Sequence, residues 1–354
     1  MEILETESNV VVLNVQPEFT VKTKEKCNAD YFILCDSDLK IDTKSALIAG
    51  VPIENWVIRA CETSPKILPY KKGENVLEII KPYISDADFS VVLFSNTPLI
   101  TKGHIRDLLW FVTSKRMNVC NLKKGFVFNN SYISSVDEVY SVDTYDFSSK
   151  DFFEVNTVDD MAEAENYLQN RIIDYHTKKG VSFESVKNLR IDASVEIGAG
   201  TNVLSGARLI GNTSIGVNVK IGENVVIKNA KIGNDVVIED NSVIIGSIVK
   251  DSSIIKEKVI IDSSAVMNNV QIERCAKVLS SKIKEHTKIS ELANIFNSRI
   301  AENVQVGIGA KIIGDNMPVL IMQKAEIGAA SMIVDTTIAS GNIVKACEIR
   351  RGEE

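Results

Sequence analysis

The side chains that could perform metal or nucleophilic chemistry are few and scattered. The sequence contains three histidines, His104, His176 and His286, and six cysteines without any C-x-x-C pair. A zinc centre needs closely grouped nitrogen and sulfur ligands, so a His/Cys metal site is not expected. The cysteines are expected to be reduced and partly buried, as in a cytosolic protein.

Short charged clusters are the next candidates. Asp36 and Asp38 follow a predicted strand and could bind a cation, but two acids in this position more often form a turn or cap a helix. The basic pairs 71–72 and 123–124 are expected to be solvated lysines. None of these clusters alone indicates an activity.

The whole chain has an ordinary globular composition. Its 354 residues, 45% hydrophobic and 25% charged, favour two or three domains. The net charge of -7 leaves no basic excess to bind nucleic acid. No apolar run is long enough to span a membrane, and residues 1–7 are acidic where a signal peptide would be basic. We therefore expect a cytoplasmic protein that binds neither nucleic acid nor membrane.

From residue 191 onward, aliphatic residues recur at every sixth position. The first series is Ile191, Ile197, Val203, Leu209, Ile215, Ile221 and Ile227. A helix needs a period of 3.6 and a flat strand a period of 2, so the pattern fits a hexapeptide solenoid. Each hexapeptide would form one side of a triangular coil, with its aliphatic side chain in the core. This predicts a left-handed parallel β-helix.

The hexapeptide register slips several times along the chain. The later series are Ile232, Ile238 and Ile244; Ile248, Ile254, Ile260, Val266, Ile272 and Val278; Ile283, Ile289 and Ile295; and Ile300, Val306 and Ile312. At each slip a loop leaves the stack or a corner is shortened. Three equivalent flat faces suit a threefold axis, and the open ends of a solenoid favour association, so we expect a homotrimer.

The first 155 residues alternate between strands and helices. Strands are expected at 9–15, 31–35, 56–60, 89–94 and 125–129, and helices at 75–84 and 102–115. This alternation predicts a shortened α/β domain with a mostly parallel, Rossmann-like sheet. Thr157 and Asp160 form a capping-box pattern that starts a linker helix, which ends near Gly180. The expected divisions are 1–155, 156–180 and 181–354.

Residues 153–165, FEVNTVDDMAEAE, carry a family resemblance. They are similar to the exit of the nucleotidyltransferase domain in the bifunctional N-acetylglucosamine-1-phosphate uridyltransferase and glucosamine-1-phosphate acetyltransferase family. In that family G-V-N precedes a helix carrying L-A-E-A-E and then a hexapeptide solenoid. Residues 64–68 and Gly73 resemble its P-K-V-L-H…G-K-P-M-L-E stretch, and residues 95–100 resemble its G-D-x-P-L-I strand end.

The resemblance implies a site for uridyl transfer, from which this chain departs. It implies a phosphate contact for Lys66 and a substrate-binding role for Gly73. It places Mg²⁺ at the positions of Asn96 and Asn156, where two neutral amides make a poor ligand pair. The family's glycine-rich phosphate turn corresponds to residues 57–63, which contain no glycine. We expect magnesium binding and uridyl transfer to be weak or lost.

The resemblance also implies an acetyl-CoA-dependent activity on the solenoid. Glu291 takes the position of the family's general-base histidine, Asn294 that of its tyrosine and Gln305 that of its substrate-binding asparagine. Glutamate can act as a base where burial raises its pKa, and His286 is a nearby second candidate. Ile308 would crowd the arm of acetyl-CoA.

Three functions stay open at this point. The chain is a sugar-nucleotide transferase with a remodelled site, or a non-catalytic relative that binds a sugar phosphate, a nucleotide sugar or a partner protein. The third reading is an acyltransferase that acts on another substrate in the groove between β-helix subunits.

Overall fold

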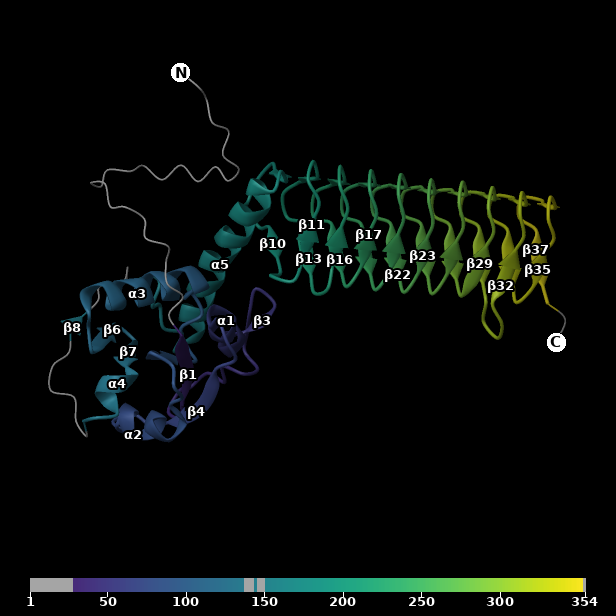
Figure 1. Cartoon of the computed structure of the whole chain (residues 1–354). Coiled ribbons are helices and arrows are strands. Elements are labelled where there is room, and N and C mark those ends of the chain that lie inside the picture. Colours follow the sequence, from purple (N-terminus) through teal and green to yellow (C-terminus); the bar gives the residue numbers. More distant parts are fainter. Residues whose placement is uncertain (1–27, 137–142, 145–149, 353–354) are drawn as a thin grey trace, which may run out of the picture.

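The computed structural model describes residues 28–136, 143–144 and 150–352. An α/β head is joined by one long helix to an extended β-helix that projects away from it (Figure 1). The strand predicted at 9–15 and Cys27 lie outside the described residues. Within the described part, no helix combines the length and the apolar character needed to cross a membrane.

The head is built on one mixed sheet with the strand order β4-β1-β5-β7-β6-β8. Its strands are β1 (Ala29–Asp36), β4 (Lys66–Tyr70), β5 (Phe89–Phe94), β6 (Val119–Leu122), β7 (Gly125–Asn129) and β8 (Asp143–Thr144). The β4-β1-β5 half is parallel, but β7 runs antiparallel to both β5 and β6. The predicted α/β class is confirmed, with a mixed rather than mostly parallel sheet.

The head contains one short hairpin and several helices. They are β2 (Leu47–Ile48), β3 (Val51–Pro52), α1 (Ile53–Ala60), α2 (Val76–Ile80), the 3-10 turn Lys81–Tyr83, α3 (Lys102–Lys115) and α4 (Asn130–Ile133). The strand expected at 56–60 is wrong, because these residues belong to α1. Ile53, Val57 and Ala60 recur at helical spacing and are all buried.

Three parallel sheets form the sides of the β-helix. Sheet I contains β10 (Arg190–Ile191), β13 (Arg208–Ile210), β16 (Val226–Lys228), β19 (Val243–Ile245), β22 (Ile260–Asp262), β25 (Lys277–Leu279), β28 (Asn294–Phe296), β31 (Lys311–Ile313), β34 (Met332–Val334) and β37 (Ile349–Arg351). Sheet II contains β11 (Glu196–Ile197), β14 (Ser214–Ile215), β17 (Lys231–Ile232), β20 (Ile248–Val249), β23 (Ala265–Val266), β26 (Lys282–Ile283), β29 (Ser298–Ile300), β32 (Val319–Ile321) and β35 (Thr337–Ile338). Sheet III contains β9 (Ser182–Phe183), β12 (Asn202–Val203), β15 (Lys220–Ile221), β18 (Val237–Ile238), β21 (Ile254–Ile255), β24 (Gln271–Ile272), β27 (Lys288–Ile289), β30 (Gln305–Val306), β33 (Glu326–Ile327) and β36 (Ile343–Val344).

The register slips have one structural cause. From β16 to β29 the corner between sheets I and II is shortened, so strands stack at a spacing of 17 residues, as in the hydrogen bond from the amide of Asn234 to Asp251. The inward side chains of one whole coil are therefore Val249, Ile255 and Ile261, all with an exposed fraction of 0%. The expectation that Ile248, Ile254 and Ile260 point inward is wrong.

The remaining aliphatic series form a continuous core along the β-helix. Residues with positive φ, such as Asn229 and Asn241, occupy its corners, where the chain turns sharply. The predicted left-handed parallel β-helix is confirmed as the fold of this region. The exact domain divisions at 155 and 180 stay predictions.

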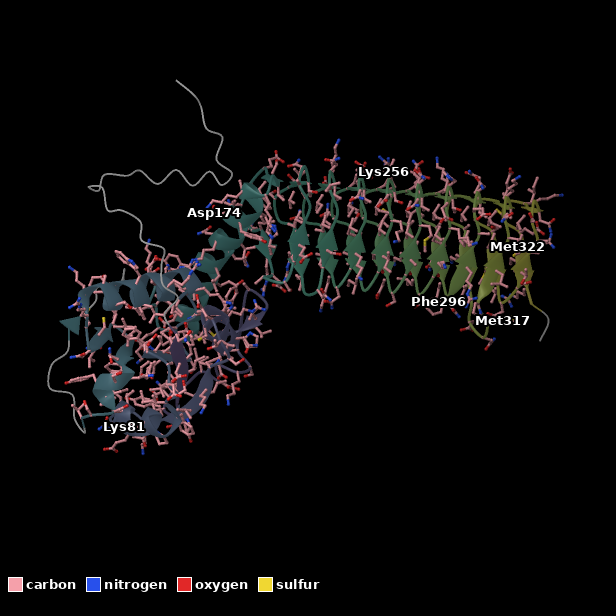
Figure 2. All side chains as sticks on the ribbon, in the orientation of Figure 1. Lys81, Asp174, Lys256, Phe296, Met317 and Met322 are labelled. Atoms are coloured by element: carbon pink, nitrogen blue, oxygen red, sulfur yellow. The ribbon has the colours of Figure 1, made fainter. Side chains whose placement is uncertain are left out.

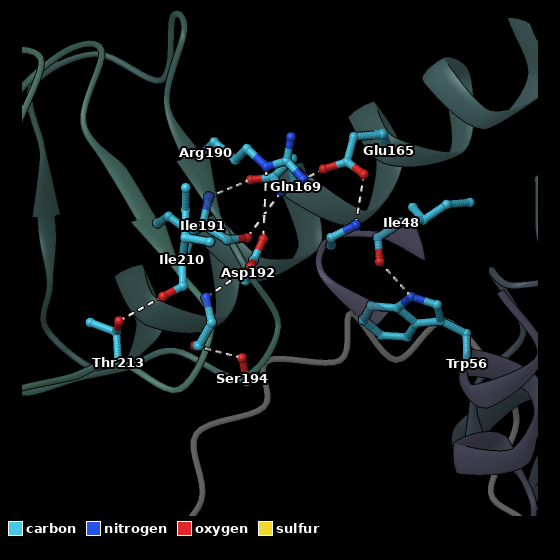
Figure 3. Close-up of polar contacts among 12 residues, drawn as sticks. Ile48, Trp56, Glu165, Gln169, Arg190, Ile191, Asp192, Ser194, Ile210 and Thr213 are labelled. Carbon is cyan, nitrogen blue, oxygen red and sulfur yellow. Dashed lines mark hydrogen bonds and ion pairs between the residues drawn. The ribbon is translucent and has the colours of Figure 1, made fainter. Parts of the chain in front are cut away.

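Helix α5 (Val158–Lys178) connects the head to the first coil. It begins with the predicted capping box of Thr157 and Asp160. In its middle, the Gln169 amide donates to the carbonyl of Ile191 and accepts from the Ile191 amide, both at 3.0 Å (Figure 3). Near its end, Ile173 packs into the apolar core of the β-helix. The helix thus covers the strand edges and apolar core at the start of the solenoid.

The β2–β3 hairpin forms the second connection between the two parts. The amide of Ala49, at its tip, donates to the carboxylate of Glu165 on α5 at 2.6 Å (Figure 3). The amide of Ala193, in the first coil, donates to the Ala49 carbonyl at 2.9 Å. The hairpin therefore contacts both the linker helix and the solenoid.

His176 should make the stability of this junction pH-dependent. Burial, and then the nearby Lys179, lower the pKa of His176 below 6.5, while a hydrogen bond with the backbone of Val195 opposes the shift. The unfolded chain then binds more protons below pH 6.5, so the free energy of unfolding is expected to fall as the pH drops through that value and to level off below the folded pKa. Urea unfolding from pH 7.5 to 5 measures this slope. His176→Met should reduce this slope, while the share of His104, whose pKa burial also lowers, should remain. An unchanged slope in His176→Met would contradict the assignment.

Candidate ligand-binding site

Asn96 and Asn156 are brought together at the carboxyl edge of the parallel strands. Asn96 follows β5, and its side chain is 2% exposed. Its Nδ2 atom donates to Oδ1 of Asn156 at 2.9 Å. The backbone amide of Val155 donates to the Asn96 carbonyl at 2.8 Å, which holds the entry to α5 against this strand end. The two positions that the sequence singled out are therefore direct neighbours.

The donor set at this point does not fit a magnesium ion. Mg²⁺ prefers carboxylate oxygens in octahedral geometry, and here two neutral amides are hydrogen-bonded to each other. Among the described residues, no group of three or more His, Cys, Asp or Glu side chains could hold a metal ion. The Asp160 carboxylate lies nearby but accepts the backbone amides of Asn156 and Thr157 as part of the helix cap.

Polar side chains that no sequence pattern had marked surround the same strand ends. Thr43 donates to the hydroxyl of Ser95 at 3.4 Å, and the Cys35 thiol donates to the Glu54 carboxylate at 3.5 Å. Glu54 belongs to the amphipathic helix α1, yet this charged residue is only 5% exposed. Burial, followed by the Glu54 charge, raises the pKa of the Cys35 thiol. This cluster fills the edge between β1 and β5 where parallel sheets usually bind ligands.

Lys66 and Gly73 do not join this group. Lys66 starts β4, and its ammonium lies 4.6 Å from the centre of the Tyr83 ring. Lys66 and Val92 pair with the same residue of β1, so they lie level with each other in the sheet. At 3.3 Å per residue, this level is about 13 Å from Asn96 along the strand direction. Gly73 lies in the turn after β4, with a φ of +97°, and no atom lies within 4 Å of the place that a Cβ would take there. The glycine-free run 57–63 is largely α1 rather than a phosphate-binding turn.

A cleft of about 590 Å³ opens beside these strand ends. Its aromatic lining includes Tyr70 and Phe94, which pack edge to face at 5.3 Å, and Phe126. Lys124 lies 4.7 Å from the centre of the Phe94 ring and 3.0 Å from Glu154. Lys123 also lines the cleft, so the pair expected to be merely solvated belongs to it. The cleft thus combines apolar rings with polar and charged side chains, including the Glu74 carboxylate, and its volume lies within the range of small-molecule sites.

The solenoid candidates lie on different parts of one coil. His286 is at the corner before β27, with a φ of +57°, whereas Glu291 is at the corner after β27. Asn294 starts β28, and its buried Oδ1 atom has no hydrogen-bond partner among the described residues. Gln305 lies on the sheet III face beside Lys288 of the preceding coil. Glu291 and Asn294 thus belong to the corner after β27 and the strand that follows it, whereas His286 belongs to the corner before β27.

Part of the chain is similar in sequence to known proteins. No protein-family model matches it. It is 45% identical over 76 residues to the bifunctional protein GlmU of Rubrobacter xylanophilus, covering 21% of this chain and 16% of that protein. It is 31% identical over 120 residues to the GlmU of Thermoanaerobacter pseudethanolicus, covering 30% and 26%. The matches thus span about a quarter or less of these curated relatives.

A solved structure was also found. It is the UDP-N-acetylglucosamine acyltransferase of Francisella novicida, with 18% sequence identity, a TM-score of 0.18 and coverage of 47% of this chain and 67% of that one. Over part of its length the chain is thus similar in sequence to the bifunctional GlmU proteins.

Proposed function

We propose that this chain is a relative of the sugar-nucleotide transferases that binds a sugar phosphate or nucleotide sugar in its head without performing uridyl transfer. The observation that carries the proposal is the hydrogen bond between Asn96 and Asn156. It occupies the two positions at which the resemblance implies Mg²⁺. Uridyl transfer needs a metal ion to neutralise the charge that develops on the phosphates, and no carboxylate pair supports one here.

The cleft beside the strand ends supports the binding part of the proposal. A sugar phosphate or nucleotide sugar carries anionic phosphates and hydrogen-bonding groups, and Lys123 and Asn121 line the cleft. Lys124 is neutralised by Glu154, so Lys123 is the cation that we assign to the phosphate. Tyr70 and Phe126 offer ring faces for the remainder of the ligand.

The alternative acyltransferase activity has less support. Glu291 and His286 lie at the two corners that flank β27, and nothing in their surroundings favours either of them as the base. Ile308 projects from the same corner stack as Glu291 with an exposed fraction of 53%, where a pantetheine arm would need space.

Uridyl-transfer activity is expected to be absent. With UTP, N-acetylglucosamine-1-phosphate and Mg²⁺, pyrophosphate release should stay far below the ~1 per second of an ordinary enzyme. Calorimetry with UDP-N-acetylglucosamine and N-acetylglucosamine-1-phosphate should detect binding that is insensitive to Mg²⁺ and weakened about tenfold in Lys123→Ala, the loss of one charge-assisted hydrogen bond. Lys115→Ala, at the exposed end of α3, is the control.

The outcomes separate the two parts of the proposal. Turnover at the ordinary rate would overturn the loss of uridyl transfer. Absence of binding to both ligands, with acetyl-CoA tested alongside, would overturn the assignment of the head as a binding domain. Binding that Lys123→Ala leaves unchanged would place the ligand outside the cleft.

A further inference from the structure

The ion pair between Lys124 and Glu154 lies at the cleft of the head. Lys124 belongs to the turn that joins β6 to β7, and its side chain lines the cleft. Its Nζ atom lies 3.0 Å from a Glu154 carboxylate oxygen and 4.7 Å from the centre of the Phe94 ring. The two charged side chains are only 26% and 30% exposed. Lys124 is therefore held between a carboxylate and a ring face, largely shielded from solvent.

The backbone that carries Glu154 is fixed on both sides. Val155 is buried, and its amide donates to the Asn96 carbonyl at 2.8 Å. On the other side, the Phe153 ring packs against Tyr167 of α5, with the ring centres 6.3 Å apart. The chain can thus keep the Glu154 carboxylate next to Lys124 at little entropic cost, and a ligand that enters the cleft meets a preformed ion pair.

The charges at the cleft nearly cancel. Lys123, Lys124 and Glu74 line it, and Glu154 adds a second carboxylate through its ion pair. The Glu74 carboxylate accepts the Lys71 amide at 2.8 Å, which fixes this negative charge at the wall of the cleft. Among the described residues that line the cleft, Lys123 is thus the only cation outside an ion pair.

Two other lysines of the head do not add positive charge to the cleft. Lys81 follows α2 at the lower edge of the head (Figure 2), and its ammonium donates to the carbonyl of Val136 at 2.7 Å. Lys66 is held over the Tyr83 ring. Neither belongs to the described lining of the cleft. The cleft therefore offers one lysine to a phosphate, while the second lysine is engaged by Glu154.

This charge balance distinguishes ligands by the number of their phosphate groups. A phosphate monoester can accept a charge-assisted hydrogen bond from Lys123. The second phosphate of a nucleotide diphosphate sugar would have to lie near Lys124. There the Glu154 carboxylate repels it and competes with it for the same ammonium group, in a site that is partly shielded from water.

We propose that Glu154 determines the specificity of the cleft and restricts it to ligands with a single phosphate group, such as a sugar monophosphate. Glu154 acts through Lys124 and is a positioning residue, because it withholds the lysine that a second phosphate would need. The inference rests on the proposed function and deepens it, since it chooses between the two ligand classes named there.

Calorimetry with two ligands that contain the same phosphorylated sugar tests the proposal. The wild type is expected to bind N-acetylglucosamine-1-phosphate at least about tenfold more tightly than UDP-N-acetylglucosamine. Glu154→Gln releases the Lys124 ammonium, so binding of UDP-N-acetylglucosamine should strengthen at least about tenfold, the gain of one charge-assisted hydrogen bond. The monophosphate already uses Lys123, so its dissociation constant should change by less than about threefold.

Two further variants keep the comparison specific. Lys124→Gln combined with Glu154→Gln removes both charges, and the gain for UDP-N-acetylglucosamine is expected to disappear because its cause is the lysine. A merely structural effect of changing Glu154 would persist in the double variant. Glu163→Gln removes the same charge from an exposed position of α5 and is the matched control, which should leave both dissociation constants unchanged.

The outcomes separate this inference from the proposed function. Binding of neither ligand by the wild type and by Glu154→Gln would overturn the proposed function, and the inference with it. Tighter binding of UDP-N-acetylglucosamine than of the monophosphate by the wild type would overturn the inference alone, and this measurement stands even if the variant fails to fold. A ratio of the two dissociation constants that a folded Glu154→Gln variant leaves unchanged would also overturn it.

Discussion

Replacing Gly50 with alanine is expected to destabilise the junction between head and β-helix by roughly 2–5 kcal/mol. Gly50 has a φ of +74°, and an added Cβ would lie 2.5 Å from Cγ of Asp192. The left-handed backbone costs an L-residue roughly 1–2 kcal/mol, and displacing packed atoms adds roughly 1–3 kcal/mol. Asp192 cannot withdraw freely, because it is 3% exposed and its carboxylate accepts the Gly211 amide at 2.9 Å (Figure 3).

Tryptophan fluorescence during urea unfolding measures this loss of stability at the β2–β3 hairpin. The indole of Trp56 donates to the carbonyl of Ile48 in the β2–β3 hairpin at 2.9 Å (Figure 3). Trp110 is the second tryptophan of the sequence and is 58% exposed, so a Trp110→Phe background isolates the Trp56 signal.

Gly73→Ala is the matched control for this variant. Gly73 also has a positive φ, +97°, but no atom lies within 4 Å of the added Cβ. It should show only the backbone cost of about 1–2 kcal/mol. Equal destabilisation by the two substitutions would contradict a steric contact between the hairpin and Asp192.

The β-helix could be predicted from the sequence because its signal is local and repeated. Each side of a coil places one aliphatic residue in the core. The period of six residues can therefore be recognised in the sequence wherever the neighbouring outward side chains are polar. The prediction failed between 248 and 261, where Ile254–Ile255 and Ile260–Ile261 offer two aliphatic residues for one inward position. The length of the corners in the neighbouring coils decides which of the two points inward. A single hexapeptide does not contain this information.

The head could be predicted less completely because tertiary packing overrides local preference there. Residues 56–60 are rich in aliphatic and aromatic side chains that suit a strand, yet Val57 and Ala60 are buried against the sheet as parts of a helix. Parallel pairing of β1 with both β4 and β5 is a non-local property of the chain. The sequence pattern therefore indicated the class of the domain but not the mixed sheet.

The candidate site was predicted only where a family position marked it. Asn96 and Asn156 were paired through the resemblance, and the fold places them in contact. Lys66 was grouped with them through sequence order, although the parallel register places it level with Phe32 and Val92, about 13 Å short of Asn96 along the strands. The cleft gathers Tyr70, Phe94 and Lys123 from three separate strand ends, so no short pattern could reveal it.

The register of the middle coils gives the final and sharpest test of the fold. Ile261→Ala is expected to lower the free energy of unfolding by about 2–5 kcal/mol, because Ile261 is 0% exposed and its loss leaves a cavity in the narrow core. Ile260→Ala, one residue earlier and directed outward between Val243 and Lys277, should cost less than about 1 kcal/mol. The two variants remove the same atoms from adjacent positions, so composition and strand propensity cancel in the comparison. Urea unfolding monitored by circular dichroism measures both, and a larger loss in Ile260→Ala would restore the register that the hexapeptide pattern alone suggested.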